Sequence, residues 1–167
     1  MLIGVDTNVL LDQAVEDQDV LDAISTIKSR LPGARFIVLP TALEELGFQF
    51  STGSDEEREA AEKALLCMRE WGYEPINIVA ARKGIAERIS FKLRSSGLLP
   101  DEEANDGFII AEAALIGCDL LLSSDHHLIE AGIHPEFRKV LKDSDVDGDH
   151  MVIGSPRTIA RKYFRKK

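Results

Sequence analysis

The sequence predicts an α/β protein with a three-layer α/β/α architecture and a central, mainly parallel sheet. Short, continuous apolar runs alternate with segments of helical periodicity, which is typical of parallel strands covered by helices on both faces. The chain has 167 residues, of which 44% are hydrophobic and 29% charged. This length fits a single domain over residues 1–167, and the composition is that of an ordinary globular protein.

The chain is expected to open with a strand and a helix. The apolar run over residues 1–5 predicts a buried first strand, and Thr7 or Asn8 can cap the helix that follows. Apolar residues then recur at helical spacing until Pro32 and Gly33 end the helix. The next unit therefore begins after this turn.

A second strand and two helices are expected next. Residues 36–39 form another apolar run, and the helix over 40–50 begins with a proline, which suits its first turn. A break follows, and Ser54 with Glu57 has the pattern of a capping box. This box predicts a long charged helix over 54–70.

The second half repeats the alternation of strands and helices. Its apolar runs are short, and its helical segments carry their apolar residues on one face. The expected elements are a strand at 75–79, a helix at 80–95, a helix that opens at Glu102 or Asn105 and reaches about 116, a strand at 120–122, a strand at 151–153 and a helix from Ser155.

Composition and charge limit the expected location of the protein and the way in which it can bind nucleic acid. No apolar run is long enough to cross a bilayer, and the first residues lack the pattern of a secretory signal. Cys67 and Cys118 lie far apart, which suits a reduced cytoplasm. The net charge of −9 argues against binding nucleic acid mainly by charge, although residues 157–167 are basic. This end is either a phosphate contact or a solvated helix face.

Acidic residues stand where ligands bind in parallel sheets. Asp6 ends the first strand, and Asp125 follows the strand at 120–122. Ligands of such sheets lie outside the carboxyl ends of the strands, so both carboxylates can face one crevice with Glu45 and Asp106. Carboxylates brought together repel and need a hard cation such as Mg²⁺ or Mn²⁺. Taken singly, each of these acidic residues is more often a helix cap or a surface charge than a functional group.

Four blocks of the sequence resemble the PIN-domain nuclease family, which includes VapC-like toxin ribonucleases. The resemblance covers nearly the whole chain, with the blocks in the family's order. They are VDTNVLLD at 5–12, PTALEEL at 40–46, NDGFIIAEAALIGCDLLLSSD at 105–125 and VIGSPRTIARKYF at 152–164.

The resemblance implies an endoribonuclease that depends on Mg²⁺ or Mn²⁺ and leaves 5′-phosphate and 3′-hydroxyl ends. It also implies an RNA substrate, a homodimer and, if the chain is a toxin, an antitoxin partner. By their match to the family's motif, Asp6, Asp106 and Asp125 would hold the metal, Glu45 would position or deprotonate water, and Asn8 and Ser123 would orient the cluster.

Several alternatives stay open at this level. The chain could be a non-catalytic binding or scaffold protein with the same fold. Glu44 neighbours Glu45, which we prefer because it precedes leucine as in the family, and residues 101–103 could add a ligand. Residues 143–149 begin like a calcium-binding loop but lack its final glutamate, so a surface turn is preferred. His126 and His127 are interpreted as a polar helix start.

Overall fold

The architecture is a parallel sheet between two layers of helices, as the sequence predicts. The structure, a computed structural model, describes residues 1–148 and 150–164. Within these residues, five parallel strands form one sheet of order β3-β2-β1-β4-β5. The strands are β1 (Leu2–Val5), β2 (Arg35–Val38), β3 (Tyr73–Pro75), β4 (Leu120–Leu122) and β5 (Val152–Gly154).

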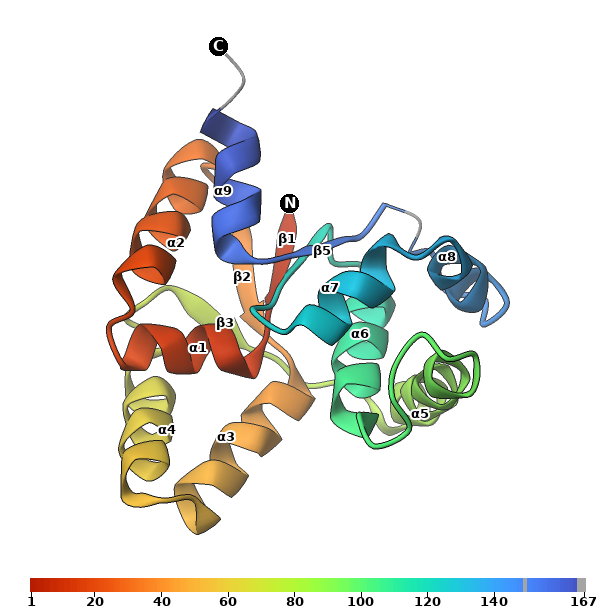
Figure 1. The fold of residues 1–167 in the computed structure, drawn as a ribbon, viewed down its shortest axis with the longest axis horizontal. Coiled ribbons are helices and arrows are strands. Elements are labelled where there is room, and N and C mark those ends of the chain that lie inside the picture. Colours follow the sequence, from red (N-terminus) through yellow and green to blue (C-terminus); the bar gives the residue numbers. More distant parts are fainter. Residues whose placement is uncertain (149, 165–167) are drawn as a thin grey trace.

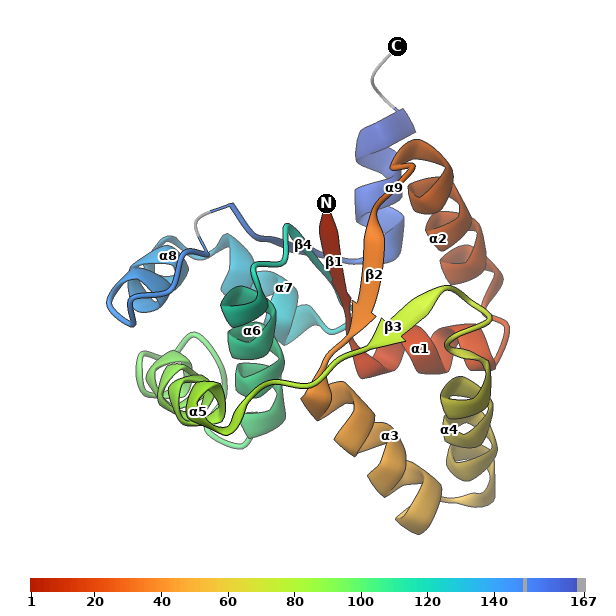
Figure 2. The same ribbon diagram turned by 180° about the vertical axis from the view of Figure 1, so that it is seen from behind.

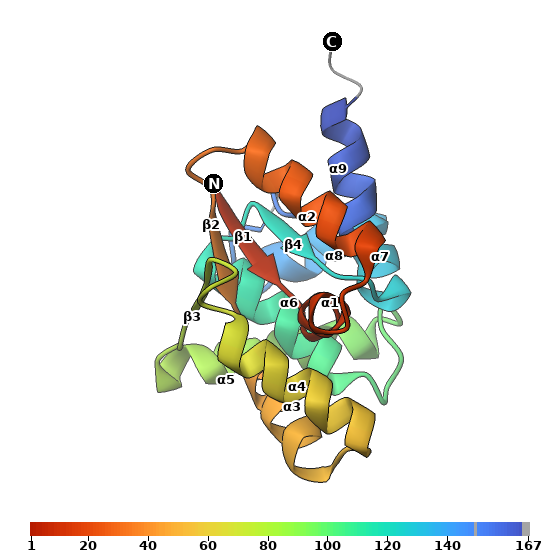
Figure 3. The ribbon, with the colours of Figure 1, turned by 90° about the vertical axis from the view of Figure 1, so that its left-hand side faces the viewer.

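Helices fill the connections between these strands and cover both faces of the sheet. They are α1 (Thr7–Ala14), α2 (Gln18–Arg30), α3 (Pro40–Thr52), α4 (Asp55–Cys67), α5 (Ala80–Ser95), α6 (Ala104–Ile116), α7 (His126–Ile133), α8 (Pro135–Lys142) and α9 (Pro156–Phe164). Figures 1 and 2 show α1, α2 and α9 on one face, and α5 and α6 on the opposite face. Figure 3 shows α2 and α9 packed side by side.

The strand order creates a switch point between β1 and β4. The chain leaves β1 toward β2 on one side and leaves β4 toward β5 on the other. Val5 of β1 lies opposite Leu122 of β4, so both strands end at the same level. In open parallel sheets, ligands bind in the crevice at such a point, outside the carboxyl ends of the strands.

The core holds the helices against the sheet. Apolar side chains of the strands and of the inward helix faces form one buried cluster, in which Ile3, Leu46 and Ile110 are fully inaccessible. One buried polar contact joins two helices across this core. Both oxygens of Glu112 on α6 accept hydrogen bonds from Thr41 on α3, one from its backbone N–H at 3.0 Å and one from its hydroxyl at 2.9 Å. Glu112 thus caps α3 from another helix, since α3 has no side-chain cap of its own.

Some boundaries differ from the sequence-based expectation. The third strand is β3 at Tyr73–Pro75 and not residues 75–79, because the buried Tyr73 ring and its hydroxyl bond to Gln13 fix the strand earlier. The first helical stretch is two helices, separated near Glu16, which has a left-handed φ of 61°. Over residues 126–142 the sequence predicts only a helix start at His126 and His127, which begins α7, and it does not predict α8.

The end of the chain packs against its beginning. Arg157 of α9 forms a 2.8 Å ion pair with Asp19 of α2. This part of the basic end therefore lies on a helix face, while residues 165–167 are outside the described residues. Among the residues that the structure describes, no helix is both long enough and apolar enough to span a membrane.

Candidate active site

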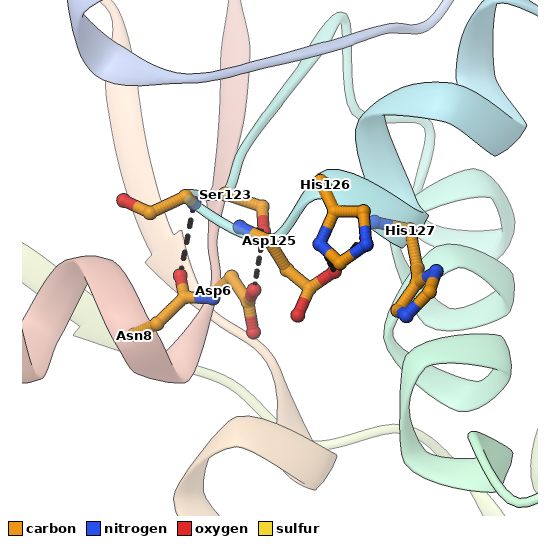
Figure 4. Close-up of polar contacts among 7 residues, drawn as sticks. Asp6, Asn8, Ser123, Asp125, His126 and His127 are labelled. Atoms are coloured by element: carbon orange, nitrogen blue, oxygen red, sulfur yellow. Dashed lines mark hydrogen bonds and ion pairs between the residues drawn. The ribbon is translucent and has the colours of Figure 1, made fainter.

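Two strand ends bring Asp6 and Asp125 together. Asp6 directly follows β1, and its backbone N–H donates to the Leu122 carbonyl of β4 at 3.0 Å. Asp125 follows β4 after a two-residue link. Figure 4 shows the two carboxylates side by side at this edge of the sheet. The pairing of β1 with β4 is therefore what places them in one crevice.

Asp6 is both a helix cap and a buried member of the site. Its side chain is 3% exposed, and it caps α1 by accepting the Thr7 backbone N–H at 2.7 Å. Its other oxygen accepts the Ser123 hydroxyl at 2.6 Å. Burial raises the pKa of Asp6 to about 7 despite these two bonds, and the charges of Glu45 and Asp125 contribute in the same direction. The carboxylate that caps α1 is thus also part of the acidic cluster.

Ser123 joins the two strand-end carboxylates. It is fully buried, and while its hydroxyl donates to Asp6, the hydroxyl oxygen accepts the backbone N–H of Asp125 at 2.9 Å. The Asp125 side chain in turn caps α7 by accepting the His127 N–H at 2.6 Å. Asn8 holds the segment that leads to Asp125, because its amide oxygen accepts the Ser124 N–H at 3.0 Å. It ties α1 to the loop after β4 (Figure 4).

Glu45 reaches the site from α3 and is held from two sides. One oxygen accepts the side-chain amide of Asn105 at 2.8 Å, and the other accepts the Thr7 hydroxyl. These contacts join α3 to the start of α1 and to the start of α6. These contacts favour Glu45 as the site residue over its neighbour Glu44. The side chain of Glu44 is exposed, although both residues line the same cleft.

Asp106 lies on the first turn of α6. Its Oδ2 atom is buried and has no hydrogen-bond partner among the described residues. Burial is the main reason that the pKa of Asp106 is raised to about 8, followed by the charges of Asp125 and Asp6 and then of Glu103 and Glu45. A buried carboxylate oxygen without a partner is costly, and a proton or a cation would satisfy it.

All four carboxylates line one cleft of about 640 Å³. Of the other acidic residues considered from the sequence, Glu103 acts on Asp106 only through its charge, and Asp101 does not line this cleft. The residues that line the cleft are Asp6, Thr7, Asn8, Leu11, Thr41, Glu44, Glu45, Phe48, Gln49, Asn105, Asp106 and Asp125.

The donor set has the chemistry of a divalent metal site. Among the described residues, no three His, Cys, Asp or Glu side chains lie close enough as placed to form a finished metal-binding group. The partnerless oxygen of Asp106 and the pKa values of Asp6 and Asp106, which burial and then neighbouring carboxylates raise, nevertheless mark a place that favours positive charge. Carboxylate oxygens are hard ligands, which suit Mg²⁺ or Mn²⁺ better than softer metals.

Sequence reasoning missed two members of the site. Thr7 and Asn105 were considered only as helix starts, yet they hold the two oxygens of Glu45. Each directly adjoins an acidic residue that had been singled out, namely Asp6 and Asp106. A polar side chain beside a candidate ligand, at the start of a helix, was the available signal.

The remaining sequence candidates lie beside the cleft or away from it. His126 and His127 begin α7, as expected, and their ring centroids lie 3.9 Å apart with the ring planes tilted by 37° (Figure 4). The Nδ1 of His126 is 4.0 Å from a carboxylate oxygen of Asp125. Residues 143–148 form turns after α8, and no metal-binding group is found in the described part of this segment, whose Asp149 lies outside the description.

Comparison with known proteins supports the fold. No protein-family model matches the sequence, and no curated protein matches it. Among solved structures, the fold is similar to that of a chain in the crystal structure of VapBC2 from Rickettsia felis bound to a DNA fragment from their promoter. The TM-score is 0.60 at 15% sequence identity, over 93% of this chain and 98% of that chain. The similarity thus extends over the whole α/β/α architecture.

Proposed function

We propose that this chain is a divalent-metal-dependent endoribonuclease that hydrolyses RNA phosphodiester bonds. In this proposal Asp6, Asp106 and Asp125 bind Mg²⁺ or Mn²⁺, and Glu45 acts on the attacking water. The observation that carries it is the convergence of these carboxylates from separate elements on one cleft, where the pKa values of Asp6 and Asp106 are raised. Strongly shifted carboxylates in a cleft are a mark of functional sites.

The chain's own residues prepare the reaction. Thr7 and Asn105 hold both oxygens of Glu45, so that its carboxylate has a fixed orientation for accepting a proton from water. Ser123 fixes Asp6 against the segment that carries Asp125. A divalent cation, when bound, would lower the pKa of a coordinated water molecule and neutralise charge on the phosphodiester. The expected products carry a 5′-phosphate and a 3′-hydroxyl.

The fold comparison and the sequence motifs favour a toxin-like role. The PIN-domain resemblance includes VapC-like toxins, and the solved structure of similar fold belongs to a VapBC2 complex. We therefore propose a cytoplasmic protein that forms a homodimer and is inhibited by an antitoxin. A basic side chain of that partner would enter the acidic cleft and replace the cation as the source of positive charge.

Cleavage of labelled single-stranded RNA tests the site. We expect activity with Mn²⁺ or Mg²⁺ and none with EDTA, and a loss of at least about 100-fold in Asp6→Asn and in Asp106→Asn, as for other groups that stabilise a transition state. Asp55→Asn is the matched control, because this exposed carboxylate on α4 lies away from the cleft. Unchanged cleavage in Asp6→Asn and Asp106→Asn would refute the assignment.

A non-catalytic binding protein of the same fold is the second candidate. It is favoured by the absence, among the described residues, of three acidic or histidine side chains placed ready for a metal. Calorimetric titration with Mn²⁺ separates the two. The nuclease proposal requires binding that Asp106→Asn abolishes, whereas a scaffold would show no binding in the cleft.

A further inference from the structure

One aromatic side chain stands exposed beside the carboxylates. Phe48 on α3 is 69% exposed and lines the cleft. It follows Glu44 and Glu45 by one helical turn, so these side chains lie on the same face of α3. Phe50, two residues further along, is 44% exposed but does not line the cleft. The exposure of Phe48 is therefore directed at the site.

The cleft offers a polyanion little attraction of its own. In the part of the chain that the structure describes, its lining includes five acidic residues and no Lys, Arg or His. The whole chain carries a net charge of −9. Phosphate contacts from basic residues, which supply most of the affinity in many nucleic-acid-binding proteins, are thus missing from the lining. Affinity beyond the metal has to come from contacts with the bases or sugars.

Phe48 is suited to such a contact. Leu11 and Phe48 are the large apolar side chains of the lining, and Phe48 is the aromatic one. Aromatic rings bind single-stranded nucleic acids by stacking on bases, and they accept any base because every base has a π-face. The exposed ring lines the same cleft as Glu45 and follows it by one helical turn on α3.

We propose that Phe48 is the stacking platform for the base that adjoins the scissile phosphate. The proposal rests on the proposed nuclease function and adds a selection rule to it. A base inside a duplex already stacks on its neighbours and is unavailable, so the site takes single strands, loops or ends in which that base is free. Recognition then depends on an unstacked base rather than on phosphate charge.

Kinetics with matched variants test this contact. We expect Phe48→Leu to lower kcat/KM on a single-stranded oligoribonucleotide by roughly 5- to 150-fold, the effect of losing one stacked base. The loss should lie mainly in KM, and Phe48→Trp should keep the activity. Phe50→Leu, the control on the same helix, should cleave like the unmodified protein. Calorimetry should show equal Mn²⁺ binding in all of these variants.

A modified substrate identifies the stacking partner. Two oligonucleotides, each lacking the base on one side of the cleaved bond, remove the stacking contact from the RNA instead of from the protein. For one of the two, Phe48→Leu should cleave the abasic substrate as fast as the unmodified protein does, and the missing base of that substrate is the one that stacks on Phe48. If Phe48→Leu reduces cleavage of intact and abasic substrates equally, stacking is excluded.

Two further results would overturn the inference in different ways. Cleavage by Phe48→Leu that equals that of Phe50→Leu and of the unmodified protein refutes the stacking role of Phe48 and leaves the nuclease proposal intact. Failure of the unmodified protein to bind Mn²⁺ and to cleave any RNA refutes the proposed function and the inference together. The Mn²⁺ titration therefore distinguishes these two failures.

Discussion

At the scale of single residues, the contact between the Thr7 hydroxyl and Glu45 tests whether Glu45 must be oriented. Thr7→Val keeps the shape of the side chain but removes its donor. We expect kcat to fall by about 10- to 100-fold, since a hydrogen bond to a charged group contributes roughly 1.5–3 kcal/mol. Thr7→Ser should restore activity. Measurement of kcat and KM checks this, and a change confined to KM would contradict the orienting role.

The raised pKa of Asp106 predicts how stability depends on pH. Its folded pKa of about 8 lies above the ordinary value of 3.8, so the folded protein binds more protons than the unfolded chain between these two pH values. Without metal, the stability that Asp106 contributes should therefore be fully present below about pH 4 and be lost as the pH rises toward 8. The shift of Asp6, to about 7, acts in the same direction.

Asp106→Asn isolates this effect. Because the Asp106 side chain is partly exposed, we discount the full shift and expect the variant to gain about 1 kcal/mol at pH 8. In a chain of this length, such a gain raises Tm by about 2–4 °C. Thermal unfolding of both proteins at pH 5 and pH 8 without metal measures it. A variant with the same pH slope as the unmodified protein would show that Asp106 does not have a raised pKa.

Residue by residue, the sequence could indicate the acidic residues and two of the residues that orient them, Asn8 and Ser123, but not the residues that hold Glu45. Asp6, Glu45, Asp106 and Asp125 could be selected because each lies at a strand end or in a recognisable local block, and the structure places all four on one cleft. Their catalytic role stays a prediction. Thr7 and Asn105 could not be selected, because their value arises only where α1, α3 and α6 meet.

At the scale of helices, the close approach of α5 and α6 fixes Asp106. A side chain at Gly107 would place its Cβ 2.3 Å from the Ser90 hydroxyl and 2.9 Å from the Ser90 Cβ. We expect Gly107→Ala to cost about 1–3 kcal/mol by overpacking and to lower activity, because Asp106 must move with the helix.

Gly84→Ala is the matched control for this packing. It lies in the interior of α5, where a Cβ would meet nothing within 4 Å. This change should stabilise the protein by about 0.5–1 kcal/mol, since alanine favours the helix. Urea unfolding of both variants gives the free energies. Equal changes in the free energy of unfolding at the two glycines would show that α5 and α6 are not packed closely at Gly107 and Ser90.

The helix that the sequence did not indicate, α8, is short and depends on packing. The eight residues of α8 are held by the burial of Phe137, Val140 and Leu141 and by His134, whose side chain accepts the Glu136 N–H at 3.2 Å. A helix of this length is marginal without such contacts. Longer elements with continuous patterns, such as α4 with its capping box at Ser54, could be predicted from local sequence alone.

At the scale of the whole molecule, the continuous core predicts how the chain unfolds. Buried side chains from all five strands of the described sheet belong to one cluster. We therefore propose that residues 1–167 act as one domain and unfold in a single transition. Scanning calorimetry should give equal calorimetric and van't Hoff enthalpies. Two resolved transitions would divide the chain into separate units.

The pairing of β4 with β5 also affects when the site can form during synthesis. The backbone N–H of Ser123 donates to the Gly154 carbonyl at 3.2 Å, and Ser123 holds Asp6. A ribosome makes Asp6 and Glu45 long before it reaches Gly154. The growing chain therefore carries these carboxylates before the strand that pairs beside Ser123 has been made, and we expect the cleft of the proposed nuclease to be completed only after residues 152–154 are synthesised.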